Sequence, residues 1–306
     1  MTIGGEDLTI TCADGFALSA RVYRPEPSTD LGRTAIITAA TGAKASYYWR
    51  YAMFLASHGF SAVVADYRGV GRSAPDGGLR GMSTRWHEWG TLDADAVIGW
   101  ALDDGPDRTV VAVGHSFGGL AVCLAPHARA VSRLLMVGAQ HAHWPDYARR
   151  ARAQMVWRWH LVMPVISTLL GFFPGRRLGW MEDVPRGVAL DWARGRRNFA
   201  RTIGRDGDAI MARLAQLDFD VLAVAATDDP FATSTATDRL LDYLPHARNQ
   251  RCSIAPDTVG SAEIGHLGLF HERFRDTLWP QSVAWLRGVE CEAATRQGRG
   301  EKWGSG

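Results

Sequence analysis

The sequence has few cysteines, no long apolar run and almost no net charge, and each of these shortages excludes a class of protein. The four cysteines among 306 residues are scattered and show no metal-like spacing. They therefore predict unpaired thiols in a reducing compartment rather than a disulfide framework. These cysteines are Cys12, Cys123, Cys252 and Cys291. The net charge of +2 gives no reason to expect a nucleic-acid partner.

The most apolar run, residues 161–173, is 13 residues long and contains Pro164. Such a run is too short to span a bilayer core of about 30 Å, so no membrane span is expected. The first residues lack a basic segment followed by an apolar core, so no signal peptide is expected either. Together these features predict a cytoplasmic protein. They leave the oligomeric state open, and a homo-oligomer is one alternative.

The first 140 residues alternate between strand-like and helix-like stretches. Residues 8–12 and 17–23 flank the turn Asp14-Gly15, which predicts an antiparallel hairpin. Short apolar runs typical of strands buried on both faces of a parallel sheet follow at 35–40, 62–65, 110–113 and 134–137. Helical stretches lie between them at 48–58, 86–102 and 118–126. This alternation predicts an α/β fold with a mostly parallel central sheet flanked by helices.

The pattern changes between residues 141 and 217, where strand-like runs vanish and helices are broken by prolines and glycines. The predicted breaks are Pro164, Gly175, Gly179 and Pro185. Strand and helix patterns then resume at 221–225, 236–244, 252–254 and 270–286. The sequence therefore predicts a core built from residues 1–140 and 218–289, with residues 141–217 inserted as a helical cap. The polar, glycine-rich tail at 290–306 is expected to be disordered.

A candidate nucleophile lies in the segment Gly114-His115-Ser116-Phe117-Gly118. This segment directly follows the apolar run 110–113 and leads into a helical stretch, which is the strand-turn-helix context of a nucleophile elbow. His115 is expected to pack behind the serine. The alternative interpretation is a glycine-rich turn with an idle serine.

Serine is a poor nucleophile unless a base takes its proton and an acid orients that base. Asp228 and Asp229 end a strand-like run, and His266 lies in a glycine-bordered loop before the last predicted helix. The alternative for the two aspartates is a solvated helix cap. His141 and His143 form a pair that suggests a metal, but no third ligand follows at a useful spacing, so no metal is expected.

These residues together resemble the α/β-hydrolase superfamily over about residues 7–286. Within it, the chain is similar to a bacterial group of predicted α/β hydrolases described as serine aminopeptidase-like or esterase-like. The resemblance rests on the Ser116 segment and on four others: Tyr47-Tyr48-Trp49-Arg50, Asp66-Tyr67-Arg68-Gly69-Val70-Gly71-Arg72-Ser73, Asp228-Asp229 and Ile264-Gly265-His266-Leu267-Gly268-Leu269-Phe270.

The resemblance implies the chain order nucleophile, acid, histidine, which Ser116, an aspartate and His266 satisfy. The acid of such a triad usually closes a Gly-x-x-Asp loop, and Ala226 occupies the glycine position, so Asp229 is preferred to Asp228.

Two backbone amides are expected to bind the oxyanion. One belongs to Phe117. The second belongs to Gly42, with Thr41 as the alternative, because Ala40-Thr41 stands where many relatives have His-Gly.

The expected activity is hydrolysis of an ester, as in a carboxylesterase or lipase, through an acyl-enzyme and without a cofactor. The alternatives are a thioesterase, an amidase or aminopeptidase, and a catalytically silent relative that binds a small molecule. Residues 141–215 carry 13 arginines, no lysines and six acids, a balance of +7. This predicts attraction of an anionic substrate or a membrane surface, or else solvated helix faces. Residues 161–173 are either a wall for an acyl chain or ordinary core.

Overall fold

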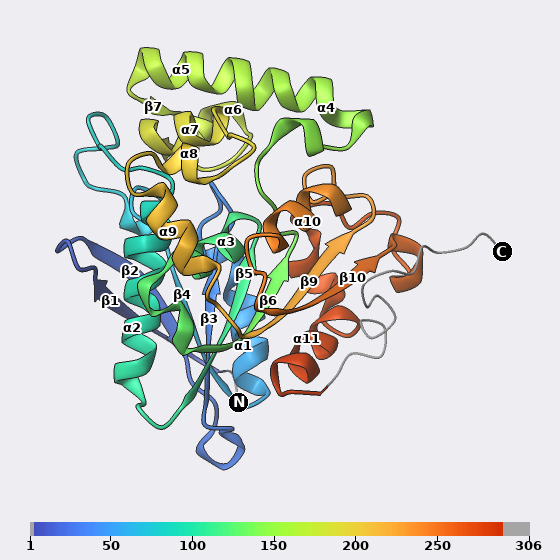
Figure 1. The fold of residues 1–306 in the computed structure, drawn as a ribbon. Coiled ribbons are helices and arrows are strands. Elements are labelled where there is room, and N and C mark those ends of the chain that lie inside the picture. Colours follow the sequence, from blue (N-terminus) through green and yellow to red (C-terminus); the bar gives the residue numbers. More distant parts are fainter. Residues whose placement is uncertain (1–2, 290–306) are drawn as a thin grey trace.

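The computed structural model describes residues 3–289, and their fold centres on one sheet of eight strands (Figure 1). The strands are arranged across the sheet in the order β1-β2-β4-β3-β5-β6-β9-β10. Every neighbouring pair from β4 to β10 is parallel, and only the two pairs that involve β2 are antiparallel. The bounds are β1 Gly5–Thr11, β2 Ala17–Tyr23, β3 Arg33–Thr38, β4 Phe60–Ala65, β5 Thr109–His115, β6 Val131–Val137, β9 Asp220–Ala226 and β10 Arg248–Ile254.

The strands form where the apolar pattern predicts them, and the hairpin is confirmed by the pairing of Thr11 with Ala17. Gly15, with φ of 83°, turns the chain there. The inner strands β3 to β6 are buried almost throughout. Strand β10 has seven residues, whereas the prediction covered only residues 252–254. It lies at the edge of the sheet, and its first residues are polar and partly exposed, so they leave no apolar signal.

Helices cover both faces of the sheet. Because successive side chains of a strand point to opposite faces, β6 shows which helix covers which side. Leu135 faces α11 (Leu278–Leu286), and Met136 lies against Gly119 of α3 (Phe117–Leu124). Helix α1 (Trp49–Ser57) packs beside α11, whereas α2 (Asp95–Asp104) contacts β1 and β3. Helix α10 (Ser234–Leu241) connects β9 to β10. The predicted flanked sheet is thus confirmed.

Two predicted helices begin later than the pattern indicated. Helix α11 starts at Leu278 rather than at residue 270, and short 3₁₀ turns occupy Gly268–Phe270 and Glu272–Phe274. Pro280 lies in the first turn of α11, where its missing N–H costs nothing, so the helix begins just before it. The stretch predicted as a helix from 86 begins at Trp89–Ala94 with π-helical hydrogen bonding before α2.

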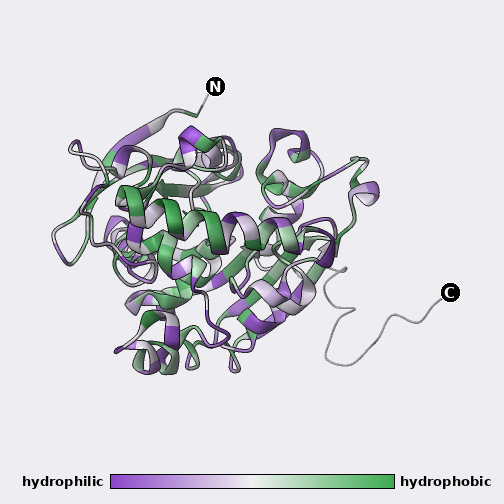
Figure 2. Ribbon diagram, turned by 90° about the horizontal axis from the view of Figure 1, so that it is seen from above, coloured by the Kyte–Doolittle hydropathy of each residue, from purple (hydrophilic) through white to green (hydrophobic). Residues whose placement is uncertain are grey.

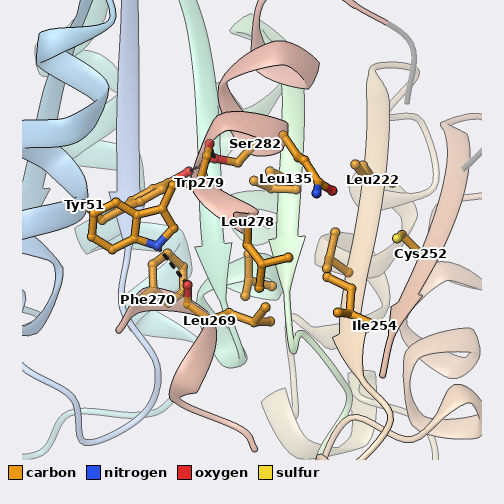
Figure 3. Close-up of a pocket in the computed structure, with 13 residues that line it drawn as sticks. Tyr51, Leu135, Leu222, Cys252, Ile254, Leu269, Phe270, Leu278, Trp279 and Ser282 are labelled. Carbon is orange, nitrogen blue, oxygen red and sulfur yellow. Dashed lines mark hydrogen bonds between the residues drawn. The ribbon is translucent and has the colours of Figure 1, made fainter. Parts of the chain in front are cut away.

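A small apolar cavity of about 50 Å³ lies between α11 and strands β6, β9 and β10 (Figure 3). Trp279 closes one side of it, and its indole N–H donates to the carbonyl of Leu269 at 3.0 Å. No candidate catalytic residue lines this cavity. We therefore assign it to imperfect packing of the last helix on the sheet.

The chain between β6 and β9 forms most of a layer that lies above the carboxyl ends of the strands (Figure 1). We call helices α4 to α8 the upper layer. Its elements are α4 Arg149–Met155, a π-helical stretch Val156–Val162, α5 Met163–Leu170, β7 Phe172–Phe173, α6 Gly175–Leu178, β8 Val184–Pro185, α7 Arg186–Ala193 and α8 Ala200–Ile203. Helix α9 (Gly207–Leu214) follows and packs against α3.

Two expectations for this segment were wrong. Pro164 does not break the helix, because the π-helical turn before it loosens the hydrogen bonding that a proline would interrupt. One helical run therefore extends from α4 to α5. A strand pair, β7 with β8, is present where none was expected, since two residues per strand are too few to leave a pattern.

Paired ions attach the upper layer to the rest of the protein. The guanidinium of Arg85 donates to both oxygens of Asp191 in α7 at 2.7 Å each. Arg239 of α10 likewise donates to both oxygens of Asp146. Such two-point pairs between arginine and carboxylate fix orientation as well as distance.

Among residues 3–289, no helix is both long enough and apolar enough to cross a membrane. The thiols of Cys12 and Cys123 are buried. Cys291 and the predicted tail at 290–306 lie outside the described residues.

Candidate active site

Ser116 lies in a sharp turn between β5 and α3. Its φ of 54° makes it the one non-glycine residue with positive φ in the described part of the chain. The two flanking glycines make this turn possible. A Cβ on Gly118 would lie 2.2 Å from the carbonyl oxygen of Thr38, and one on Gly114 would lie 2.4 Å from the Cα of Gly119. The Gly-x-Ser-x-Gly spacing is thus required by close backbone contacts.

Ser116, His266 and Asp229 form a hydrogen-bonded row. The distance from Ser116 Oγ to His266 Nε2 is 2.9 Å, and that from His266 Nδ1 to Asp229 Oδ2 is 2.7 Å. Because a carboxylate only accepts, Nδ1 carries the proton and Nε2 is left to accept from the serine hydroxyl. This geometry suits a base that removes the proton of Ser116.

The Asp229 carboxylate is buried and well supplied with donors. Its Oδ1 accepts the backbone N–H groups of Phe231 and Ala232 at 2.8 and 3.1 Å. Burial by itself would raise the pKa of Asp229, but the neighbouring His266 and these N–H groups more than offset it, so the pKa lies below its ordinary value. The group therefore stays ionised beside the imidazole.

The neighbouring Asp228 has a different partner. Its carboxylate accepts the backbone N–H groups of Ile264 and Gly265 at 2.9 and 3.0 Å. It thus holds the loop that carries His266 and does not contact the ring. The structure places Asp229, and not Asp228, against the imidazole.

His115 takes part in a buried chain of hydrogen bonds that the sequence did not reveal. Its Nε2–H donates to the backbone carbonyl of His266 at 2.9 Å, and its Nδ1 accepts from the hydroxyl of Tyr48 at 2.7 Å. The Tyr48 oxygen in turn accepts the N–H of Ala40 at 2.9 Å. Burial, together with the nearby His266, lowers the pKa of His115 to about 3, so the ring is neutral.

The amides expected to bind an oxyanion belong to Phe117, after β5, and to the loop that follows β3. Phe117 is the first residue of α3, and the first N–H groups of a helix have no partner within it. Gly42 has φ of 72°, and its carbonyl accepts the N–H of Glu182 from the upper layer at 2.8 Å. In the described part of the chain, the N–H groups of Thr41 and Gly42 donate to no other group. Both remain candidates for the second donor.

A pocket of about 200 Å³ opens at Ser116 and His266 beneath the upper layer. Three stacked tryptophans contribute to its wall, and the first of them rests on Phe117 behind the lining. Trp86 stacks on Phe117 with centroids 4.4 Å apart, and Trp159 stacks on Trp192 at 4.8 Å. Among residues 3–289, His266 is the only ionisable side chain that lines the pocket. The full lining is Ala40, Thr41, Gly42, Ala43, Trp86, Ser116, Gln140, Ala142, Trp159, Trp180, Met181, Trp192, Phe231, His266 and Leu267.

Gln140 is a buried polar residue of this lining. It is 6% exposed, and its Oε1 has no hydrogen-bond partner within residues 3–289. Buried polar atoms are rarely left unpaired, so this oxygen is available to a donor on a bound molecule. No group of three or more His, Cys, Asp or Glu side chains in the same residues is arranged to hold a metal ion. His141 Nε2 instead lies at the carbonyl of Arg196.

Residues 35–257 match the family model described as the alpha/beta hydrolase fold. The chain belongs to this family. The predicted superfamily and fold class are therefore confirmed. A soluble variant of monoglyceride lipase from Saccharomyces cerevisiae superposes with a TM-score of 0.69 at 14% identity, covering 95% of this chain and 97% of that one.

Two esterase structures are also similar to this α/β hydrolase. A thermostable carboxyl esterase from Bacillus coagulans gives a TM-score of 0.61 at 14% identity, covering 94% of this chain and 99% of the other. The esterase domain of a Rhodothermus marinus protein gives 0.58 at 16%, covering 94% and 100%. At such low sequence identity, the structural similarity is evidence for the fold only.

Proposed function

We propose that this α/β hydrolase cleaves a carboxylic ester through an acyl-enzyme formed on Ser116. The observation that carries the proposal is the hydrogen-bonded row from Ser116 through His266 to Asp229, with the serine held at the elbow. A catalytically silent relative would have no need to keep a strained serine within 2.9 Å of a correctly oriented imidazole. The esterase and lipase structures that share the fold point in the same direction.

In the proposed reaction, Ser116 Oγ attacks the ester carbonyl carbon while His266 Nε2 takes the hydroxyl proton. Asp229 keeps the imidazolium oriented and compensates its charge. The amides of Phe117 and Gly42, or Thr41 in its place, bind the negative oxygen of the tetrahedral intermediate. His266 then gives its proton to the leaving alkoxide, and the alcohol departs. Water, deprotonated by His266, releases the acid and restores the serine.

The lining of the pocket favours an uncharged, compact acyl or aryl group. At about 200 Å³ the pocket is smaller than the roughly 300–1,000 Å³ of sites that hold drug-sized ligands. None of the arginines between residues 3 and 289 lines it, so the basic segment at 141–215 does not act on the acyl group directly. Gln140 supplies one hydrogen-bond acceptor for a substrate N–H or O–H. We regard the segment between residues 141 and 217 as a cap, because its tryptophans close this pocket from above.

Hydrolysis of p-nitrophenyl esters from acetate to decanoate by wild type and by Ser116→Ala tests the proposal. We expect turnover that is highest for the short acyl chains and is abolished in the variant. A fluorophosphonate probe should label Ser116 in the wild type only. Equal background rates in both proteins, with no labelling, would refute the proposal. Parallel assays with a thioester and an anilide of the same acyl group decide between the ester and its alternatives.

A further inference from the structure

The helical run from α4 to α5 has two apolar faces. Side chains four residues apart are packed against the protein: Met155, Trp159, Met163 and Ser167 are all buried. Trp159 reaches the active-site pocket from this face. Four-residue spacing keeps side chains on one side of a helix, so residues two positions away point in the opposite direction.

The opposite face is apolar as well, and it is exposed. Trp157, Leu161, Val165 and Leu169 also follow one another at four-residue spacing, and they are 59%, 52%, 59% and 78% exposed. We call these four residues the apolar stripe. The run that carries it lies across the top of the molecule, and its α5 half is strongly hydrophobic (Figure 2). Single exposed apolar side chains are ordinary, whereas a continuous row of large ones marks an interaction surface.

The segment that carries the apolar stripe has charges of one sign only. Residues 149–178 contain six arginines and no Asp, Glu or Lys: Arg149, Arg150, Arg152, Arg158, Arg176 and Arg177. Arg149 and Arg150 are exposed at the start of α4, and Arg176, Arg177 and Leu178 are exposed in α6, which follows the run. Arg176 lies 3.8 Å from Glu182, whereas Arg149 and Arg177 form no ion pair with any described residue.

We propose that the apolar stripe, together with the exposed arginines of α4 and α6, docks this protein on the surface of an anionic lipid bilayer. Large apolar side chains suit the boundary between headgroups and acyl chains, and guanidinium groups suit the lipid phosphates beside it. The helical run lies in the plane of the interface and does not cross the bilayer. Its other face forms part of the roof of the active-site pocket, so docking holds that pocket about one helix diameter, roughly 10 Å, from the lipid.

A second copy of this chain is a poorer occupant of the same surface. Packing two apolar stripes together would bring the arginines of both copies to one interface, with no acid in residues 149–178 of either copy to neutralise them. Like charges brought together at an interface oppose association. A bilayer that contains anionic lipid supplies the missing negative charge.

Sedimentation with vesicles tests this proposal on the full chain. One set of vesicles contains phosphatidylcholine alone, and the other also contains phosphatidylglycerol. We expect wild type to bind the second set at low salt, to be released by added salt, and to bind the first set at least ten-fold more weakly. Leu161→Gln with Leu169→Gln should weaken binding at least ten-fold. Leu31→Gln makes the same replacement at an exposed leucine before β3, outside the apolar stripe, and should leave vesicle binding unchanged.

Both altered leucines are exposed and outside the pocket lining, so thermal melts and hydrolysis of a water-soluble ester should match those of wild type. Failure of wild type to sediment with anionic vesicles would overturn the proposal, as would equal binding by the double variant. It would equally be overturned by a dimer in light scattering that the double variant converts to monomer. These readouts measure binding, so they remain decisive even if the proposed ester hydrolysis is wrong.

Discussion

The backbone at Ser116 stores strain that a single substitution should release. With φ of 54° and ψ of −122°, the residue occupies a region that side chains with a Cβ rarely adopt. Such conformations cost about 1–3 kcal/mol. Glycine adopts them freely, but it loses about 0.5–1 kcal/mol through the greater freedom of the unfolded chain. Relief of this strain by Ser116→Gly should therefore contribute about 1 kcal/mol to the free energy of unfolding, before the loss of the serine's hydrogen bond is counted.

Ser116→Ala is the matched comparison, because it removes the hydroxyl and keeps the Cβ. It loses one partly buried hydrogen bond to His266, a change of about 0.5–1.5 kcal/mol at most. Both variants lack the nucleophile and should be inactive. We therefore expect Ser116→Gly to exceed Ser116→Ala in free energy of unfolding by about 1–2 kcal/mol, since the strain is relieved in one variant and retained in the other.

Urea unfolding followed by tryptophan fluorescence measures the difference. Ser253, an exposed and regularly paired residue of strand β10, gives the control pair. At this ordinary strand position, glycine should be less stable than alanine by about 0.5–1 kcal/mol. If Ser116→Gly proved no more stable than Ser116→Ala, while Ser253 behaved as stated, the turn at Ser116 would not be strained.

Three further outcomes are expected. Asp229→Asn should lower kcat by about 10³–10⁴-fold, because the amide oxygen stays with the N–H groups of Phe231 and Ala232 and the NH₂ group then faces His266 Nδ1, which loses its acceptor. Asp228→Asn keeps an oxygen for the Gly265 amide and should cost less than about ten-fold; ester kinetics separate the two, and equal losses would contradict the assignment. The pKa of His115 is about 3 in the folded protein against an ordinary 6.5, so between these values the unfolded chain binds a proton that the folded chain does not bind. The free energy of unfolding therefore decreases as the pH is lowered. Compared with His115→Gln, wild type should lose about 2 kcal/mol more between pH 7 and pH 5 in urea titrations, and parallel curves would exclude a neutral buried ring. Trp180→Ala should shift the preferred p-nitrophenyl ester toward longer acyl chains, unlike Trp144→Ala outside the pocket, and an unchanged profile would place the acyl group elsewhere.

Much of the sheet could be predicted from the sequence because burial on both faces leaves an unbroken apolar run. Strand β5 illustrates this, since six of its seven residues are buried. At the edge of the sheet the strand is not buried on both faces, so it lacks an unbroken apolar run and only the last part of β10 was predicted. Where a helix begins was harder to predict, because apolar residues such as Phe270 and Phe274 also pack as part of short 3₁₀ turns.

The candidate site was also predicted only in part from the sequence. Ser116 could be identified because its turn requires glycines at fixed distances along the chain. The choice between Asp228 and Asp229 depends on the direction in which each side chain points from the turn after β9. The residue types alone do not determine this direction. The contact between Tyr48 and His115 joins residues 67 positions apart, so no local pattern reveals it. In the sequence, Tyr48 is distinguished only as a member of the aromatic cluster Tyr47-Tyr48-Trp49.

His266 is positioned from three directions that converge on one loop. Asp229 holds its Nδ1, Asp228 holds the amide before it, and His115 holds its own carbonyl. The third of these continues through Tyr48 to the N–H of Ala40, at the start of the loop whose amides are proposed to bind the oxyanion. Because Tyr48 and His115 are fully buried and each ring nitrogen of His115 has one partner, a shift of either loop would leave a polar group unpaired. The base and the proposed oxyanion site are therefore held in register by the same chain of hydrogen bonds, and a substitution at Tyr48 should disturb both together.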